Sequence, residues 1–337
     1  MSSPNAARSI GLIHSIHPNN EAYFHSLAST SEEIRTMRHN VHDIMCTTCM
    51  KTEKDLGQPM RKCGKCHVVW YCSKECQTKH WPKHKPICGE AGIPKLIRSL
   101  LSNALLTTVL KGCFVLHYDL LNKSMADAPL MARVDLAVEP ADILEFAQMY
   151  LEGPLDRKVQ GMIQFNGFRA GTSADMLSLT PQRREIWRKT RDEANAKGLR
   201  TDQDPVVLVE FGYGDGLNSI TSALLIDSKT KMIMKESMAE GFIMTSAITG
   251  EVTTLPCNIE TSMEFMNMHI RADKKNQLLL RTEMQPFDVQ YIRRSATNFF
   301  GGPATTLNQK IAREAIYRSI YEMLLTHKTG ELTQKTS

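Results

Sequence analysis

Eight side chains that could bind a soft metal ion recur in pairs within a 43-residue segment. In chain order they are Cys46-x2-Cys49, Cys63-x2-Cys66, Cys72-x3-Cys76 and His84-x3-Cys88. Seven of the nine cysteines of the chain fall in this segment. Ordinary buried cysteines would not gather at such spacings, so the pattern indicates metal binding. Cys113 and Cys257 lie elsewhere in apolar stretches, and we expect them to be small core residues.

The chemistry that fits these ligands is structural zinc. Zinc takes four ligands in a tetrahedron, and structural sites are closed by Cys and His. A two-residue spacer lets both sulfurs of a tight turn face one ion, and Gly64 suits such a turn because glycine tolerates positive φ. A three-residue spacer places two ligands one helical turn apart, which predicts short helices at Cys72/Cys76 and at His84/Cys88. Eight ligands complete two closed sites and leave no open position for catalysis.

The spacing leaves two choices open. It does not select among the three ways of combining four ligand pairs into two sites. His80 also competes with His84 as the histidine ligand. Val68, Val69, Trp70 and Tyr71 are expected to pack between the two sites.

With "YCSKECQ" and "HWPKHKPIC" in its second half, the segment resembles the MYND-type zinc finger over residues 46–88. All eight ligand positions of that family are present, together with its Tyr-Cys and His-Trp pairs. The resemblance implies two structural Zn²⁺ ions in an interleaved, cross-brace arrangement and favours His84 over His80. One ion would be held by Cys46, Cys49, Cys72 and Cys76, and the other by Cys63, Cys66, His84 and Cys88.

The resemblance also implies a function in protein interaction. MYND fingers similar to this one bind short proline-rich peptides, of the kind Pro-x-Leu-x-Pro, as an added extended strand. The positions that match the peptide contacts of the family are Ser73, Gln77 and Trp81. An aromatic face for proline and an amide for backbone hydrogen bonds are suited to this recognition. We therefore expect a docking module whose partner is a proline-rich segment of another protein.

Two enzymatic interpretations start from the same sequence. SET-and-MYND lysine methyltransferases should show an "NHSC"-like stretch, a C-terminal aromatic motif and a cysteine-rich post-SET segment, and none is found here. Glu210 to Gly216 in "VVLVEFGYGDG" resembles the first motif of Rossmann-type methyltransferases. Asp227 follows Gly216 by only 11 residues, which leaves room for a second strand but not for a helix and a strand. We expect a glycine-rich hairpin and a non-catalytic domain, with an S-adenosylmethionine-dependent methyltransferase as the alternative.

The elements around these motifs predict an α+β fold with a mainly antiparallel sheet. Apolar spacing predicts one long helix from about 95 to 121, and capping signals predict helices after "TSEE", from Pro140 and between Thr180 and Gly198. A closing amphipathic helix is expected over 306–328. The predicted strands cover 132–138, 158–171, 204–214, 219–227 and 232–238, with a hairpin over 242–255.

These elements suggest five parts of the chain. They are a polar, partly helical segment (1–45), the finger (46–88), a Gly/Pro linker (89–94), an α+β domain of unknown role (95–326) and a disordered tail (327–337).

Charge and hydropathy narrow the possible partners. The net charge is +5, and the finger alone carries nine basic residues against three acidic ones. Seven thiolates and two Zn²⁺ ions would lower the charge of the finger to about +3. Its lysines are thus partly a counterweight to the thiolates, and a nucleic-acid partner is not favoured. No apolar run reaches 18 residues and the N-terminus lacks a secretory core, so we expect an intracellular, nuclear or cytoplasmic protein with no membrane partner.

Overall fold

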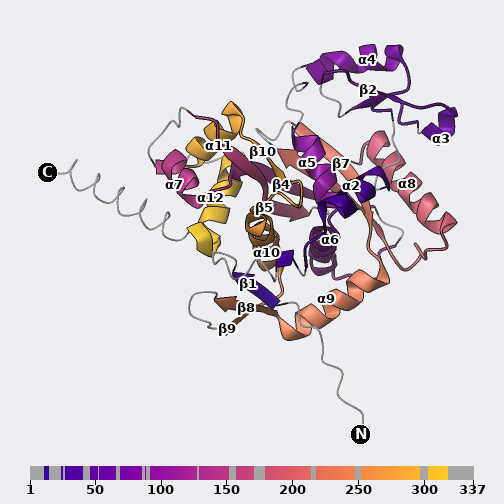
Figure 1. Cartoon of the computed structure of the whole chain (residues 1–337). Coiled ribbons are helices and arrows are strands. Elements are labelled where there is room, and N and C mark those ends of the chain that lie inside the picture. Colours follow the sequence, from indigo (N-terminus) through magenta and orange to yellow (C-terminus); the bar gives the residue numbers. More distant parts are fainter. Residues whose placement is uncertain are drawn as a thin grey trace, which may run out of the picture. The chain divides into compact units, whose positions relative to one another are not determined.

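The computed structural model describes most of the chain, in two compact units (Figure 1). The described residues are 11–14, 24–25, 27–40, 46–51, 53–65, 69–85, 88, 92–126, 129–151, 157–170, 179–213, 218–246, 252–296 and 303–317. The smaller unit comprises 25–108 and 273–280, and the larger unit comprises the rest. The division falls within helix α6 (Ala104–Tyr118) and not at the linker expected over 89–94. The tail expected at 327–337 lies outside the described residues.

The smaller unit begins with helix α2 (Ser31–Asn40), at the place where "TSEE" predicts a helix. The start is a capping box. The backbone N–H of Glu33 donates to Thr30 Oγ1 at 3.2 Å, and the backbone N–H of Thr30 donates to Glu33 Oε2 at 2.7 Å. Ser31 Oγ donates to the carbonyl of Gln277 at 2.7 Å, which ties the distant loop 273–280 to this helix.

The long helix predicted from 95 to 121 is wrong, because the chain forms two helices there. Helix α5 (Gly92–Leu101) ends before Ser102, and α6 starts after Asn103. Asn103 Oδ1 accepts from the backbone N–H of Leu106 at 2.9 Å, so Asn103 acts as an N-cap. Thr107 Oγ1 donates to the Leu101 carbonyl at 2.9 Å and satisfies an end of α5. Because α5 starts at Gly92, part of the expected linker is helical.

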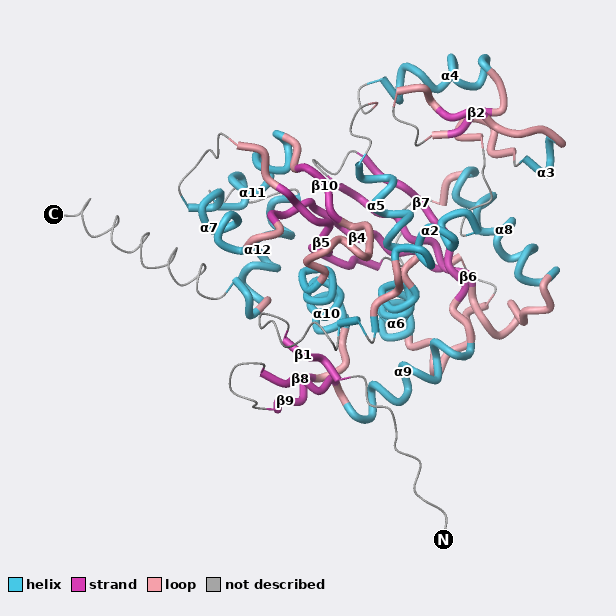
Figure 2. Tube along the Cα trace, viewed as in Figure 1, coloured by secondary structure: helices cyan, strands magenta, loops and turns pink. Residues whose placement is uncertain are grey.

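A five-stranded mixed sheet forms the centre of the larger unit (Figure 2). Its order is β10 (Arg281–Glu283), β5 (Gln160–Ala170), β4 (Leu130–Pro140), β6 (Val206–Tyr213) and β7 (Asn218–Leu225). Only the β4–β6 pair is parallel, so the sheet is mainly antiparallel as predicted. A bulge interrupts β4–β5 pairing between Asp135 and Leu136. β4 is buried along nearly its whole length and does not show the one-sided burial that alternation suggests.

The topology bears on the glycine-rich stretch. β7 pairs antiparallel with β6, with Val206 opposite Leu225 and Tyr213 opposite Asn218. Residues 218–225 therefore form the second strand of a hairpin, not a helix that leads into a parallel sheet. The described residues thus lack the strand–helix arrangement that the methyltransferase alternative requires. The turn itself, 214–217, lies outside the described residues.

Gly212 has a packing role in this strand. A Cβ at this position would lie 2.4 Å from Nη2 of Arg133 on the neighbouring strand. The glycine leaves room for that guanidinium group.

The strand predicted over 232–238 is also wrong. These residues lie in helix α9 (Ser228–Glu240). Asp227 Oδ1 accepts from the backbone N–H of Thr230 at 2.8 Å as the N-cap, and Gly241 ends the helix at φ 75°. The alternating apolar residues of "MIMKESM" are mostly exposed, so local capping decides the structure here.

The predicted hairpin over 242–255 is confirmed as β8 (Phe242–Ser246) and β9 (Val252–Leu255). The structure adds β1 (Gly11–His14), which pairs in parallel with β8. The other helices of the larger unit are α7 (Ile143–Leu151), α8 (Pro181–Ala196), α10 (Ile259–Ala272), α11 (Pro286–Ala296) and α12 (Pro303–Arg313), followed by the 3-10 helix η3 (Ala315–Tyr317). Helix α8 has Thr180 as its N-cap and is followed by Gly198 at φ 73°, as predicted.

In the described part of the chain, no single helix is long and apolar enough to cross a membrane. Helices α5 and α6 reach that length and composition only when they are taken together.

A network of buried charges joins the sheet to the C-terminal helices. Glu139 on β4 is fully buried and accepts from Lys310 Nζ at 2.5 Å and from Arg271 Nη2 at 2.8 Å. Tyr317 also donates to this carboxylate. Glu314 belongs to the same network and accepts from Asn267 Nδ2 at 2.7 Å. Burial raises the pKa of the Glu314 carboxyl to about 7, even though the cations of Lys310 and Arg271 oppose this.

We expect Glu314→Gln to remove a pH dependence of stability. The folded protein keeps the Glu314 proton in the interval from about pH 4.5 to about pH 7, where an unfolded chain has lost it, so stability falls as pH rises through this interval. The amide matches the neutral acid in shape and charge. The variant should therefore equal the wild type at the acidic end and exceed it by about 3 kcal/mol at the neutral end. Denaturant unfolding across this pH range measures the difference.

Glu236→Gln, which replaces an exposed carboxylate on α9, is the control and should follow the wild-type curve. Parallel curves for Glu314→Gln and the wild type would contradict the buried, protonated carboxyl.

Candidate metal centre

The segment 46–88 folds around a very small apolar cluster. Its regular elements are α3 (Glu53–Leu56), β2 (Arg61–Lys62), β3 (Trp70–Tyr71) and α4 (Lys74–His84). Met60 and Tyr71 are buried in this cluster among three of the cysteines, and Leu56, Val69 and Trp70 pack against it. This confirms the packing predicted for Val69, Trp70 and Tyr71, while Val68 lies outside the described residues. Such a cluster is too small to stabilise a fold without cross-links or metal.

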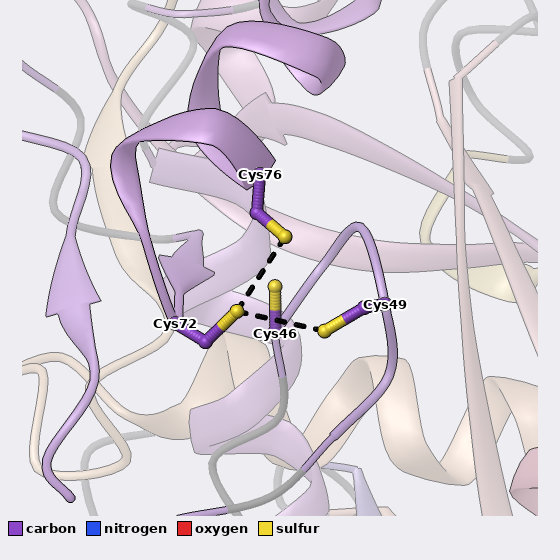
Figure 3. Close-up of side chains that lie close together, drawn as sticks. All are labelled: Cys46, Cys49, Cys72 and Cys76. Atoms are coloured by element: carbon purple, nitrogen blue, oxygen red, sulfur yellow. Dashed lines mark hydrogen bonds between the residues drawn. The ribbon is translucent and has the colours of Figure 1, made fainter. Parts of the chain in front are cut away.

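The structure brings Cys46, Cys49, Cys72 and Cys76 together. Their four Sγ atoms all lie within 4.8 Å of one another. The Cys72 sulfur lies 3.5 Å from that of Cys49 and 3.4 Å from that of Cys76. Figure 3 shows the four side chains pointing toward a common centre, with Cys76 on a helix and the other three on the chain segments around it.

Local turns create this geometry. The backbone N–H of Met50 donates to the Cys46 carbonyl at 2.8 Å, and Met50 adopts a left-handed φ of 61°. This closes the turn that aims both Cys46 and Cys49 at one point. Gly64 is not among the residues with positive φ, so the role proposed for it is wrong, and the left-handed residue belongs to the first turn.

Helix α4 connects the two ligand groups. Cys76 lies in its first turn and His84 is its last residue. Ser73 is the N-cap, with its Oγ accepting from the backbone N–H of Cys76 at 3.3 Å. One helix of 11 residues thus replaces the two short helices predicted from the spacing.

The second group contains Cys63, His84 and Cys88, which are all buried, with one donor atom from each within 4.8 Å of the others. The sulfurs of Cys63 and Cys88 are 3.6 Å apart. The fourth residue expected here, Cys66, lies outside the described residues. The two groups interleave along the chain, because Cys63 falls between the two halves of the first group.

His80 takes a different position. Its Nδ1 is hydrogen-bonded to the hydroxyl of Tyr71 at 2.8 Å, and its ring stacks on that of His84 with centroids 5.6 Å apart. His80 therefore supports the ligand histidine from outside the group. The Tyr71–His80 contact is a feature that the ligand pattern could not reveal, since it joins a strand to a helix.

Electrostatics favours a cation among the four sulfurs. Burial opposes ionisation of Cys46, yet hydrogen bonds from the backbone of Cys49, Cys72 and Thr48 lower the pKa of its thiol to about 6. Burial and the neighbouring sulfurs, Cys46 included, raise the pKa of Cys72 to about 12, and burial raises the pKa of Cys76. Four adjacent thiols resist full ionisation, and a dication would reverse this effect.

The donor set fits zinc. A tetrahedral ion with Zn–S bonds of about 2.3 Å requires sulfur atoms about 3.8 Å apart. The observed separations of 3.4 to 3.6 Å are close to this value and far above the length of a disulfide bond of about 2.05 Å. Four thiolates, or three thiolates with one imidazole, are combinations typical of structural zinc.

The three residues expected to contact a peptide share one face of α4. Ser73, Gln77 and Trp81 are spaced four apart, so they form a stripe along the helix. Trp81 is 38% exposed, and its ring meets that of His84 edge-on with centroids 5.9 Å apart. Ser73 and Gln77 are partly exposed. The Ser73 hydroxyl already accepts a helix N–H, so its capping role limits what it can offer a ligand.

Comparison with known families gives two matches along the chain. Residues 46–88 match the model of the MYND finger. Residues 88–317 match the model of a domain of unknown function, DUF8205. No catalytic family is among these matches.

Curated relatives resemble the chain over the finger region. A SET and MYND domain-containing protein of Dictyostelium discoideum is 38% identical over 77 residues, which are 22% of this chain and 14% of that protein. A zinc finger MYND domain-containing protein 10 homolog of Drosophila melanogaster is 44% identical over 46 residues, 14% of this chain and 9% of the relative. The N-lysine methyltransferase SMYD2-B of Danio rerio is 42% identical over 45 residues, 13% of this chain and 9% of the relative. No solved structure matches the chain.

We expect the two neighbouring histidines to respond differently to substitution. His84→Gln removes a side chain of the second group and should lower the zinc content by about one ion per chain. His80→Gln removes only the contact with Tyr71 and should leave the zinc content unchanged. Mass spectrometry of the metal in purified full-length protein measures both. Retained zinc in His84→Gln with loss in His80→Gln would assign the ligand to the wrong histidine.

Proposed function

Since this chain belongs to the DUF8205 family and carries a MYND finger ahead of that domain, we propose that it docks a proline-rich segment of another protein through a finger built on two zinc ions. The finger is a zinc-binding, protein-interaction module. The proposal adds the number of ions, their ligands and the class of peptide.

The two ligand groups support the number of ions. Cys46, Cys49, Cys72 and Cys76 would hold one Zn²⁺, and Cys63, Cys66, His84 and Cys88 the other. The interleaving of the groups along the chain agrees with a cross-brace. These thiols remain available as ligands in a reducing intracellular compartment, where we place the protein.

The observation that carries the docking proposal is the stripe of Ser73, Gln77 and Trp81 on α4. Metal-ligand groups fix this helix near both of its ends, so the stripe lies on a rigid element. Trp81 offers an indole face for proline, and Gln77 offers an amide that can pair with an extended backbone. Strand addition along this face would give affinity through main-chain hydrogen bonds, with Trp81 selecting the side chain.

We expect purified protein to contain two zinc ions per chain. Chelation should unfold the finger, because the binding free energy of a structural zinc, about 10–16 kcal/mol, replaces the core that this segment lacks. Metal analysis gives the ratio, and the fluorescence of Trp70 and Trp81 reports the unfolding.

Cys257→Ala, which lies outside the finger, should keep both ions and serves as the control. A ratio of one or zero in the wild type would rule out the two-ion proposal.

We expect Trp81→Ala to weaken binding of a Pro-x-Leu-x-Pro peptide by at least about tenfold, because buried aromatic anchors dominate such interfaces. Calorimetric titration with full-length protein measures the affinity, and metal analysis checks that both ions remain. Lys79→Ala, on the opposite face of the same helix, should bind like the wild type. Equal affinity for Trp81→Ala and wild type would remove the docking face from this position.

A further inference from the structure

One face of the five-stranded sheet carries charged side chains in neighbouring register. Arg133 on β4 lies opposite Arg169 on β5 and Glu210 on β6. Two residues further along β4, Asp135 lies opposite Gly167 and Gly212. Because side chains alternate along a strand, these residues share one face of the sheet. A sheet inside a domain normally buries apolar side chains, so this arrangement calls for an explanation.

The charges alternate across four elements. Arg133 Nε donates to Asp135 Oδ1 at 2.8 Å, and Arg169 Nη2 donates to Asp135 Oδ2 at 2.6 Å. Arg183 on α8 donates to Glu210, whose Oε1 lies 3.8 Å from Arg133 Nη1. We call these five side chains the arginine row. They carry three positive and two negative charges.

Exposure differs sharply between the two kinds of charge. The side chains of Asp135 and Glu210 are only 6% and 7% exposed, whereas Arg133 and Arg183 are 20% and 18% exposed and Arg169 is 48% exposed. The carboxylates thus form the floor, and the guanidinium groups lie between that floor and solvent. A solute would meet the positive groups first.

Glycines and helix α12 shape this floor. Gly212 leaves room for the guanidinium group of Arg133, as described above. A Cβ at Gly167 would lie 2.5 Å from Cγ2 of Thr306 on α12. Glycine inside a strand often marks the close approach of another group, and here it allows charged and polar groups to converge around Asp135.

Structural ion pairing alone is a poor explanation of the arginine row. The register sets Arg133 directly opposite Arg169, and like charges in that position destabilise a strand pair. Asp135 compensates for part of this, yet the net charge of the row stays at +1. Burial of its two carboxylates carries a further desolvation cost. A row built only for stability would need one cation fewer.

We propose that the arginine row binds the phosphate group of a small molecule. Guanidinium forks bind phosphate oxygens in a bidentate geometry, and the charge of a phosphate exceeds the net charge that the row must offset. Arg169 is the gripping residue, because it is half exposed and is anchored to Asp135 through one amino group. The proposal concerns the larger unit and does not depend on the finger. Free phosphate and a phosphate monoester share this chemistry.

The test measures the melting temperature of full-length protein in a titration with inorganic phosphate, at an ionic strength held constant with sodium chloride. A second titration uses glycerol phosphate as the monoester, and a third uses acetate. We expect both phosphate probes to raise the melting temperature of the wild type, by about 3–6 °C at about ten times the dissociation constant. A larger shift with glycerol phosphate identifies an esterified ligand, and a larger shift with phosphate identifies the free ion.

Arg169→Gln should abolish the shift, whatever its own melting temperature, because each variant is compared with itself in the absence of phosphate. Arg188→Gln is the matched control. This arginine is exposed on α8 and pairs with Glu185, and its loss should leave the shift intact. Absence of a shift in the wild type, an equal shift in Arg169→Gln, or a shift with acetate as large as that with phosphate would overturn the proposal.

Discussion

The mutual repulsion of closely packed thiolates governs the N-terminal half of this protein. Four sulfur atoms held within 4.8 Å of one another cannot all ionise unless a cation compensates them. The raised pKa values of Cys72 and Cys76 express that repulsion. The backbone turn at Cys46–Met50 and the capped start of α4 hold the sulfurs in place despite it. Since the apolar cluster around Tyr71 is small, the fold of the finger depends on how this charge is neutralised.

A related constraint operates in the larger unit, where charge is compensated by charge. Glu139 is buried with Lys310 and Arg271, and Asn267 links this network to the backbone of Phe165 through hydrogen bonds of 2.7 and 2.8 Å. Removing a single partner from such a network leaves an uncompensated charge in a medium that solvates it poorly. The arginine row differs from this network because its cations face solvent. The two clusters thus represent two uses of buried carboxylates, one closed and one open to a ligand.

The features that the sequence predicts best are those fixed by short-range geometry. The spacing of the cysteines, the capping box at Thr30 and the caps of α8 each depend on residues a few positions apart, and all are found in the structure. The strand predicted at 232–238 failed because an alternating apolar pattern was weighted above the caps at Asp227 and Gly241. The helix predicted across 95–121 failed because Asn103 can cap a helix in the middle of an apolar stretch. The pairing of β1 with β8 and the arginine row join residues far apart in the chain, so periodicity and motif carry no signal for them.

Helix α4 has one further consequence. It supplies Cys76 to one ligand group and His84 to the other, and the stripe with Trp81 lies between these two anchors. Oxidation of a thiol in either group, or competition for the metal by another chelator, would release one end of the helix and misalign the whole stripe. Recognition of a partner at this surface would then vary with the redox state and the zinc supply of the cell, without any separate sensor.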